Sequence, residues 1–157
     1  MTLGKEILEM IIADRKMRDT LSHWTHILAS IKRVKTLPGT NWVSMEQVAR
    51  YYNIDVKEIK KVYGAHKAEI EGDGTALLPR NFYMGSSLNV MTIKQPGSIK
   101  YQFDDGMEVI INNRGIKVFS VKAMLRIGML LPGSEIAARV RKELLQIFVE
   151  ENCKEIA

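Results

Sequence analysis

The feature that most constrains the fold is a pair of short amphipathic helices predicted just before the middle of the chain. Ser44 is followed three residues later by Gln47, and Asp55 by Glu58 at the same spacing, and each pair is a capping box that marks a helix start. Because the two starts, at 44 and 55, lie only eleven residues apart, a tight turn must separate the helices. Asn53 suits this turn, since its side chain tolerates the left-handed backbone that ends a helix. The stretch therefore predicts a helix-turn-helix.

The apolar residues of this stretch fall on one side of each helix, so the two helices can pack on each other. They are Val48, Ala49 and Tyr52 in the first helix, Ile54 in the turn, and Val56, Ile59 and Val62 in the second helix. The small side chain of Ala49 lets the helices approach closely where they cross. The second helix, predicted over residues 55–67, keeps its lysines on the outer side, and a cationic face on an anchored helix is what a recognition helix requires.

This pattern predicts binding of double-stranded DNA. The residues expected at the interface are Ser44, Gln47, Asp55, Lys57, Lys60, Lys61, Gly64 and Lys67. The alternative is a plain helical hairpin whose lysines are only solvated. Two capping boxes, a small residue at the crossing and a basic outer face together favour DNA binding over the plain hairpin.

Charge is unevenly placed along the 157 residues, whose formal net charge is +5. Residues 1–67 hold 12 Lys and Arg against 7 Asp and Glu, whereas residues 68–157 hold 11 of each kind, so the whole excess lies in the first part. Charge asymmetry of this kind favours a polyanionic partner for the part of the chain that contains the helix pair.

The sequence carries no signal for a membrane or for secretion. No run of about twenty apolar residues is present, and Lys5, Glu6 and Glu9 interrupt the apolar N-terminus. A single cysteine, Cys153, excludes an internal disulfide framework and suits a reducing compartment. We therefore expect a cytoplasmic protein without a membrane partner.

The chain is predicted to divide into three regions. Residues 1–70 form the DNA-binding domain, which begins with a helical arm in two pieces between Leu3 and about Lys35. Residues 71–87, where glycine, serine and proline interrupt any periodicity, are predicted to be a linker. Residues 88–157 begin with strand-like segments that hairpin turns such as Asp105-Gly106 separate, which predicts an antiparallel meander. These segments cover residues 88–94, 99–104, 107–112 and 116–119.

Two helices are predicted to complete the third region. Ser120 caps the first, 121–131, which is apolar on nearly every side and must be buried. Ser134 caps the second, whose apolar stripe consists of Ile136, Ala137, Val140, Leu144, Leu145, Phe148 and Val149. The predicted fold class is therefore α+β, with an N-terminal helical helix-turn-helix domain followed by a small antiparallel β-meander packed with two C-terminal helices. Because the stripe is wider than the meander and one helix would cover, residues 88–157 are expected to be a dimerisation or effector domain of a homodimer.

Other polar groups do not form a convincing catalytic or metal-binding pattern. His23 and His26 could hold zinc together with His66 or Cys153, but the spacing fits no ligand motif, and a surface pair flanking a tryptophan is favoured. Asp104, Asp105 and Glu108 surround a predicted hairpin, where aspartates form turns. A basic group on the last helix, formed by Arg139, Arg141 and Lys142, is interpreted as a solvated face rather than as a phosphate contact. We expect no enzyme activity, no cofactor and no metal.

Two stretches together resemble phage and mobile-element DNA-binding regulators, including Bro-type and related antirepressor amino-terminal domains. The first covers residues 41–54, from Asn41-Trp42-Val43 through the first helix to Ile54. The second covers residues 114–145, in which a strand passes into a helix, a polar turn follows, and the segment finishes on an arginine-bearing helix. The resemblance implies transcriptional control in a phage or mobile element. The alternative is an antirepressor-like module that inactivates another regulator by direct protein contact.

Overall fold

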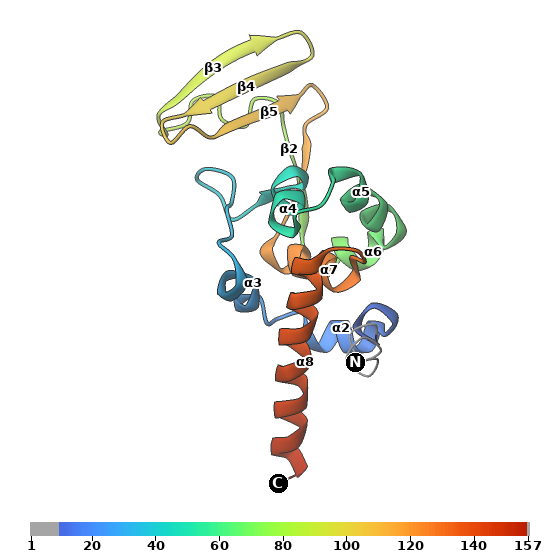
Figure 1. Cartoon of the computed structure of the whole chain (residues 1–157). Helices are drawn as coiled ribbons and strands as arrows, with labels where there is room; N and C mark the ends of the chain where they lie inside the picture. The colour runs from blue at the N-terminus through green and yellow to red at the C-terminus, as the bar shows by residue number, and fades with distance from the viewer. Residues whose placement is uncertain (1–9, 157) are drawn as a thin grey trace.

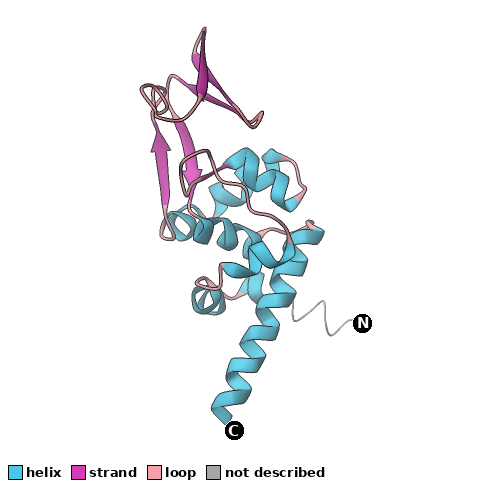
Figure 2. Cartoon of the chain, turned by 90° about the vertical axis from the view of Figure 1, so that its left-hand side faces the viewer, coloured by secondary structure: helices cyan, strands magenta, loops and turns pink. Residues whose placement is uncertain are grey.

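The computed structural model describes residues 10–156, so the expected helix from Leu3 lies partly outside the described residues. Figure 1 shows a body of helices with a sheet at one end, and the helix α8, Glu135–Ile156, projects from the other end. The turned view in Figure 2 shows the same order, with the strands gathered at one end. The structure thus confirms the predicted α+β class, with helices first, a three-stranded meander and helices last. Among the described residues, no helix has both the length and the apolar character needed to cross a membrane.

The elements follow one another in an order close to the predicted one. The helices are α2 Arg15–Leu21, α3 His26–Ile31, α4 Met45–Tyr52, α5 Val56–Ala65, α6 Lys67–Glu71, α7 Val121–Leu130 and α8 Glu135–Ile156. The strands are β1 Val43–Ser44, β2 Thr75–Leu78, β3 Val90–Gln95, β4 Ser98–Phe103, β5 Glu108–Asn112 and β6 Ile116–Phe119. The N-terminal helical segment ends at Ile31, earlier than predicted, because Lys32 takes an extended conformation.

The strands form two separate antiparallel sheets. Three of the four predicted strand segments make the meander β3-β4-β5, but the fourth, β6, leaves it and lies between β1 and β2. The strand β2 falls inside the predicted linker, where Thr75 pairs with Phe119 and Leu78 with Ile116. The physical reason is burial. Val118 and Phe119 at the end of β6 are both fully buried, which requires a neighbouring strand on each side of β6.

The C-terminal helices pack on the N-terminal helices. One apolar core joins residues of α3, α4, α5, α7 and α8, whereas a second core lies between the meander and the small sheet. The helix α7 is buried along its length, as predicted. The meander therefore packs with the rest of the chain through Tyr83, Leu37 and Val118, and not directly beneath α7 and α8.

The predicted apolar stripe of α8 is largely used within the chain itself. Ala137, Val140, Leu144 and Leu145 are buried in the first core, and only Val149 is an exposed large apolar residue of the stripe. These four residues therefore do not form the surplus apolar face that the sequence predicts for contact with a second subunit. The reason is that α3, α4 and α7, rather than the meander, supply the cover.

A buried ionic network ties α2, α6 and α7 together. Glu69 accepts hydrogen bonds from Arg18 at 2.7 and 2.8 Å and from Arg126 at 3.0 Å. Arg126 also donates to Asp73 at 2.6 Å and to Asp19 at 2.7 Å. Burial opposes the charged form of Arg126, but these carboxylates outweigh it and raise its pKa. Each buried charge in this network is therefore paired, which a buried ion requires.

Candidate nucleic-acid interface

The helix pair forms as the local sequence predicts. The backbone amide of Ser44 donates to Gln47 Oε1 at 2.9 Å, and the Gln47 amide donates to Ser44 Oγ at 3.1 Å, so the first capping box is complete. Asn53 ends α4 in the left-handed region with φ 52° and ψ 52°. Asp55 caps α5 by accepting from the Lys57 amide at 2.8 Å, but the described contacts include no return bond from Glu58, so the second capping box predicted from the sequence is incomplete. The turn between the helices is therefore fixed by the left-handed backbone of Asn53 and by the Asp55 cap.

Two adjacent tyrosines hold α4 in place. The Tyr51 hydroxyl donates to the Leu28 carbonyl of α3 at 2.6 Å, and the Tyr52 hydroxyl donates to the Met124 carbonyl of α7 at 2.7 Å. Burial raises the pKa of Tyr51 to about 12 and raises that of Tyr52 well above its ordinary value, so both hydroxyls remain donors at neutral pH. Ser134, at the start of α8, donates to the Tyr52 carbonyl at 2.7 Å. The first helix of the pair is thus attached to α3, α7 and α8.

The helix α5 is anchored on one side and solvated on the other. Ile59 and Val62 are buried in the first core, whereas the predicted outer residues are all exposed: Lys57, Lys60, Lys61, Gly64 and Lys67. A methyl group added at Gly64 would meet nothing within 4 Å, so this part of the helix surface is open. The helix ends at Ala65, because the backbone of His66 departs from helical geometry, and Lys67 begins α6 instead of ending α5.

The α5 lysines carry unneutralised charge. Within the described structure, Lys57, Lys60 and Lys61 have no carboxylate oxygen within 4.0 Å. Lys117 of β6 differs, since its ammonium lies 3.7 Å from Glu71 and 5.9 Å from the ring centroid of Tyr63. The outer surface of α5 is therefore available to an anion, whereas the neighbouring cation on the sheet is already paired.

The remaining predicted interface residues have structural tasks. Ser44, Gln47 and Asp55 each use a side-chain oxygen to cap a helix. Such caps fix the helix starts, and their loss typically costs about 1 kcal/mol. Ser44 and Gln47 are partly buried, so they are less accessible to a ligand than the α5 lysines.

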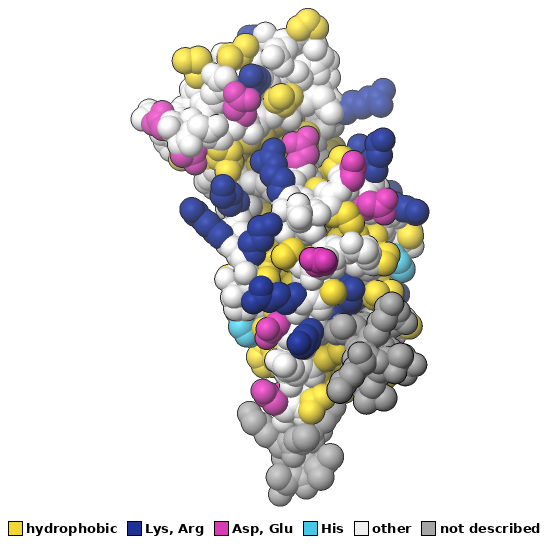
Figure 3. All heavy atoms as spheres, viewed as in Figure 1, with side chains coloured by type: hydrophobic (Ala, Val, Ile, Leu, Met, Phe, Trp, Pro, Cys, Tyr) yellow, Lys and Arg dark blue, Asp and Glu magenta, His cyan; other side chains and the backbone are white. Residues whose placement is uncertain are grey.

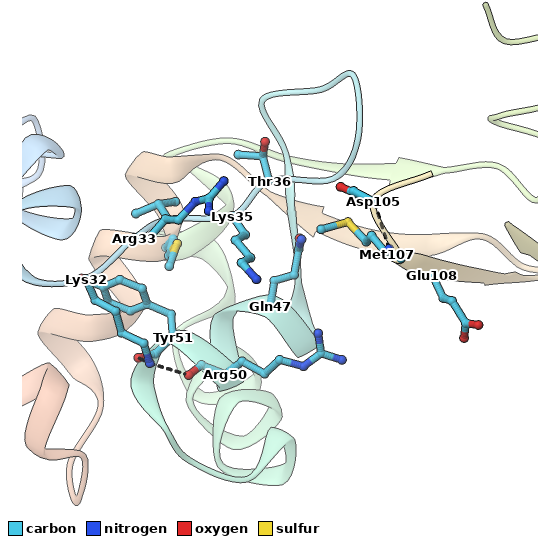
Figure 4. A pocket seen from close by; sticks show the side chains of 13 residues that line it. Lys32, Arg33, Lys35, Thr36, Gln47, Arg50, Tyr51, Asp105, Met107 and Glu108 are labelled. Carbon is cyan, nitrogen blue, oxygen red and sulfur yellow. Dashed lines mark hydrogen bonds between the residues drawn. The ribbon is translucent and has the colours of Figure 1, made fainter. Parts of the chain in front are cut away.

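A second basic surface lies beside the helix pair, and we did not predict it from the sequence. It is an open groove of about 1010 Å³, which we call the basic groove. Its basic wall consists of Lys32, Arg33, Lys35 and Arg50, and the β4–β5 turn with Asp105 and Glu108 forms the opposite rim. Figure 4 shows that these lining side chains come from three parts of the chain. The run Lys32-Arg33-Val34-Lys35 is the sequence signal for this groove, but the helical period predicts it as the end of a helix.

Charged side chains gather on this side of the molecule. Figure 3 shows lysine and arginine side chains in a band between the meander and the projecting helix. Arg141 is not part of this surface. It is buried and donates to the carbonyls of Gly128 and Leu131 at 2.9 and 2.8 Å. The interpretation of Arg141 as part of a solvated face is therefore wrong. Its guanidinium instead binds carbonyls at the end of α7.

The described residues include no cluster of three histidine, cysteine or carboxylate side chains that could hold a metal ion. His23 and His26 flank Trp24, with ring centroids 5.0 and 5.5 Å from the indole. The side chain of Cys153 lies outside the described residues. Asp105 accepts from the Met107 amide at 2.9 Å, as a turn-forming aspartate does.

Comparison with models of protein families, with curated proteins and with solved structures finds no match for this chain.

Proposed function

We propose that this protein binds double-stranded DNA in a sequence-specific manner and regulates transcription in a phage or mobile element, with α5 as the recognition helix. The observation that carries the proposal is the outer surface of α5. Three exposed lysines, which have no carboxylate partner in the described part of the chain, lie on a helix whose other side, at Ile59 and Val62, is buried. A helix whose inner side packs against the core can enter the major groove without unfolding. Its cations release counterions from the phosphates when they bind.

The elements around the helix pair support the proposal. The helix α3 and the short strand β1 precede α4. The strands β2 and β6 follow the helix pair, and the meander lies between these two strands in the sequence. In the small sheet, β6 lies between β1 and β2. Because β1 leads directly into α4, this small sheet helps to hold the helix pair in place.

The first test is selection of bound duplexes from a random pool, followed by binding measurements on the variants Lys57→Ala, Lys60→Ala and Lys61→Ala. A lost phosphate contact should lower the salt slope by about one, and a lost base contact should cost roughly 1–3 kcal/mol and relax the sequence preference. Lys16→Ala on the exposed side of α2 is the matched control, because it removes the same charge outside α5. If all three α5 variants bind like the control, α5 is not the recognition helix.

We further infer a homodimer, because one helix-turn-helix reads only a few base pairs and specific sites are commonly read by two copies about one helical turn apart. Sedimentation at micromolar concentration tests this inference. A monomer that binds a single half-site as tightly as a palindrome would contradict it.

A second candidate is the antirepressor-like module that inactivates another regulator by contact, and the outer side of the meander favours it. Met91 and Ile93 of β3 and Ile110 of β5 are exposed there by 63%, 36% and 52%. The register places Ile93 and Ile110 on either side of Lys100, so the two isoleucines lie on one face of the sheet. Exposed apolar side chains that share a face are typical of protein contacts.

Competition separates the two candidates. A DNA regulator must bind its selected duplex in the presence of excess random duplex, whereas a protein-contact module has no such preference. The variant Ile93→Ser with Ile110→Ser should leave binding to the selected duplex unchanged if the first proposal holds.

A further inference from the structure

The basic groove begins with an extended segment after α3. Lys32, which ends α3, has φ −158° and ψ 151°, and the residues that follow it belong to no helix or strand. Side chains of extended chains alternate between two faces, and Val34 packs against the first core, whereas Arg33 and Lys35 are exposed. Arg33 and Lys35 therefore share the solvated face, with their Cα atoms about 6.6 Å apart along the chain.

Not every cation of the groove is available. The Lys32 ammonium donates to the carbonyls of Arg50 and Tyr51 at 3.0 and 2.9 Å, so it holds the end of α4. For Arg33, Lys35 and Arg50, the described contacts include neither a side-chain hydrogen bond nor a carboxylate within 4.0 Å. Figure 4 shows Lys35 and Arg50 directed into the same space, with Gln47 between them. Three uncompensated cations from two parts of the chain thus meet in one groove.

The carboxylates on the opposite rim are engaged within the meander. Glu108 accepts from the Gln102 amide at 2.8 Å and lies 3.4 Å from the Lys100 ammonium, and Asp105 accepts from a backbone amide in its own turn. Hydrogen bonding from Gln102, together with the hydrogen bond and the charge of Lys100, outweighs the effect of burial and lowers the pKa of Glu108. Both rim carboxylates therefore have partners within the meander and do not neutralise the basic wall.

The lining also indicates how a ligand would be held. The only aromatic residue that lines the described groove is Tyr51, which is 4% exposed and whose hydroxyl is already bonded to Leu28. The groove therefore lacks a ring on which a base could stack, which single-strand binding proteins commonly use. Arginine guanidinium groups match phosphate geometry, and phosphate contacts position a protein on DNA without reading its sequence.

We propose that the basic groove binds the phosphate backbone of the DNA duplex that α5 reads, through Arg33, Lys35 and Arg50, independently of sequence. This proposal rests on the proposed function of α5. Arg50 lies in the last turn of α4, three residues before Asn53, so the groove adjoins the turn from which α5 departs. A backbone contact at this position would hold the duplex beside the recognition helix.

The test compares the selected duplex with a random duplex of the same length, over a range of salt concentrations. Arg33→Ala, Lys35→Ala and Arg50→Ala should each lower the salt slope by about one and weaken binding to both duplexes roughly five-fold at 0.15 M salt, so that their ratio stays constant. Asp105→Asn should act in the opposite direction and strengthen binding to both, because it removes a rim charge and keeps the oxygen that caps the turn. Lys16→Ala is again the control, and thermal unfolding of each variant checks that the fold is intact.

The outcomes separate this proposal from the one for α5. Groove variants that behave like Lys16→Ala, while the α5 variants lose binding, would overturn the groove proposal alone. Groove variants that change the ratio between the two duplexes would also overturn it, since the groove would then read sequence. If the groove variants weaken binding and the α5 variants do not, the role of α5 fails and the groove stands as a DNA backbone site.

Discussion

Two glycines inside helices differ in a way that predicts opposite effects of the same substitution. Gly128 lies in the buried helix α7, and Gly64 lies on the exposed side of α5. An alanine normally favours an α-helix over glycine by about 1 kcal/mol, so Gly→Ala should be stabilising wherever the methyl group has room. At Gly64 nothing lies within 4 Å of the added carbon. We therefore expect Gly64→Ala to raise the free energy of unfolding by about 0.5–1 kcal/mol.

At Gly128 the added carbon would lie 2.6 Å from Tyr52 Cζ and 2.8 Å from Tyr52 Cε1. The ring cannot easily move away, because it is fully buried, its hydroxyl is bonded to Met124, and it packs edge-on against Tyr51 at 4.9 Å. Overpacking of a core typically costs about 1–3 kcal/mol. The added methyl group would also strain the hydrogen bond from Tyr52 to Met124. This strain adds about 1 kcal/mol to the cost, which offsets the gain in helix propensity. Gly128→Ala should therefore lower the free energy of unfolding by roughly 1–3 kcal/mol.

Urea unfolding followed by circular dichroism measures both variants, provided that the slope of the free energy with urea stays constant. Tyr52→Phe removes the hydroxyl nearest to the added carbon, so Gly128→Ala should be less harmful in that background, and the double-mutant cycle gives the coupling. A Gly128→Ala protein as stable as the Gly64→Ala protein would refute the close approach of α4 and α7.

Three further predictions concern stability. Burial favours the neutral form of Glu69, but hydrogen bonds and charge from Arg18 and Arg126 outweigh the effect of burial and lower the pKa of Glu69. The ionised carboxylate therefore stabilises the folded protein above the unfolded-state pKa of about 4.3, and this stabilisation is lost as the pH falls through the folded-state pKa. Glu69→Gln should lower the free energy of unfolding by about 3–5 kcal/mol at pH 7, and it should reduce the loss of that free energy with falling pH, as measured by urea unfolding at several pH values. An unchanged dependence on pH in the acid range would contradict this. Ala49→Leu, at a buried position of α4, should cost about 1–3 kcal/mol in thermal unfolding and weaken DNA binding with it, whereas parental values would exclude a close crossing at Ala49. Truncation after Gly133 removes Val140 and Leu144 from the first core, so the remaining chain should lose its cooperative unfolding transition, and a folded fragment would disprove a shared core.

The parts of the fold that were predictable depend on neighbours in the sequence. Ser44 and Gln47 cap a helix start, Asn53 takes the left-handed turn, and the position of each follows from residues within one helical turn. The exposed position of the α5 lysines follows from the same helical period that buries Ile59 and Val62. These features depend on local geometry, which a single sequence specifies.

The parts that were missed depend on contacts between distant residues. Arg126 is one of two cations on an otherwise apolar helix, and nothing near it in the sequence indicates that Asp19, Glu69 and Asp73 surround it. In the same way, β2 is a four-residue strand that exists because β6 lies beside it. The basic groove was missed because Lys32 leaves the helical conformation that the preceding apolar period predicts.

The end of α4 shows why the helix pair is not an independent unit. The last carbonyls of a helix have no partner within it. Here the carbonyls of Arg50 and Tyr51 accept from the Lys32 ammonium, and the Tyr52 carbonyl accepts from the Ser134 hydroxyl. The direction in which α5 leaves the turn therefore depends on Lys32, which borders the basic groove, and on Ser134, at the start of α8. A substitution in either segment reaches the proposed recognition helix through these bonds, without any contact to DNA.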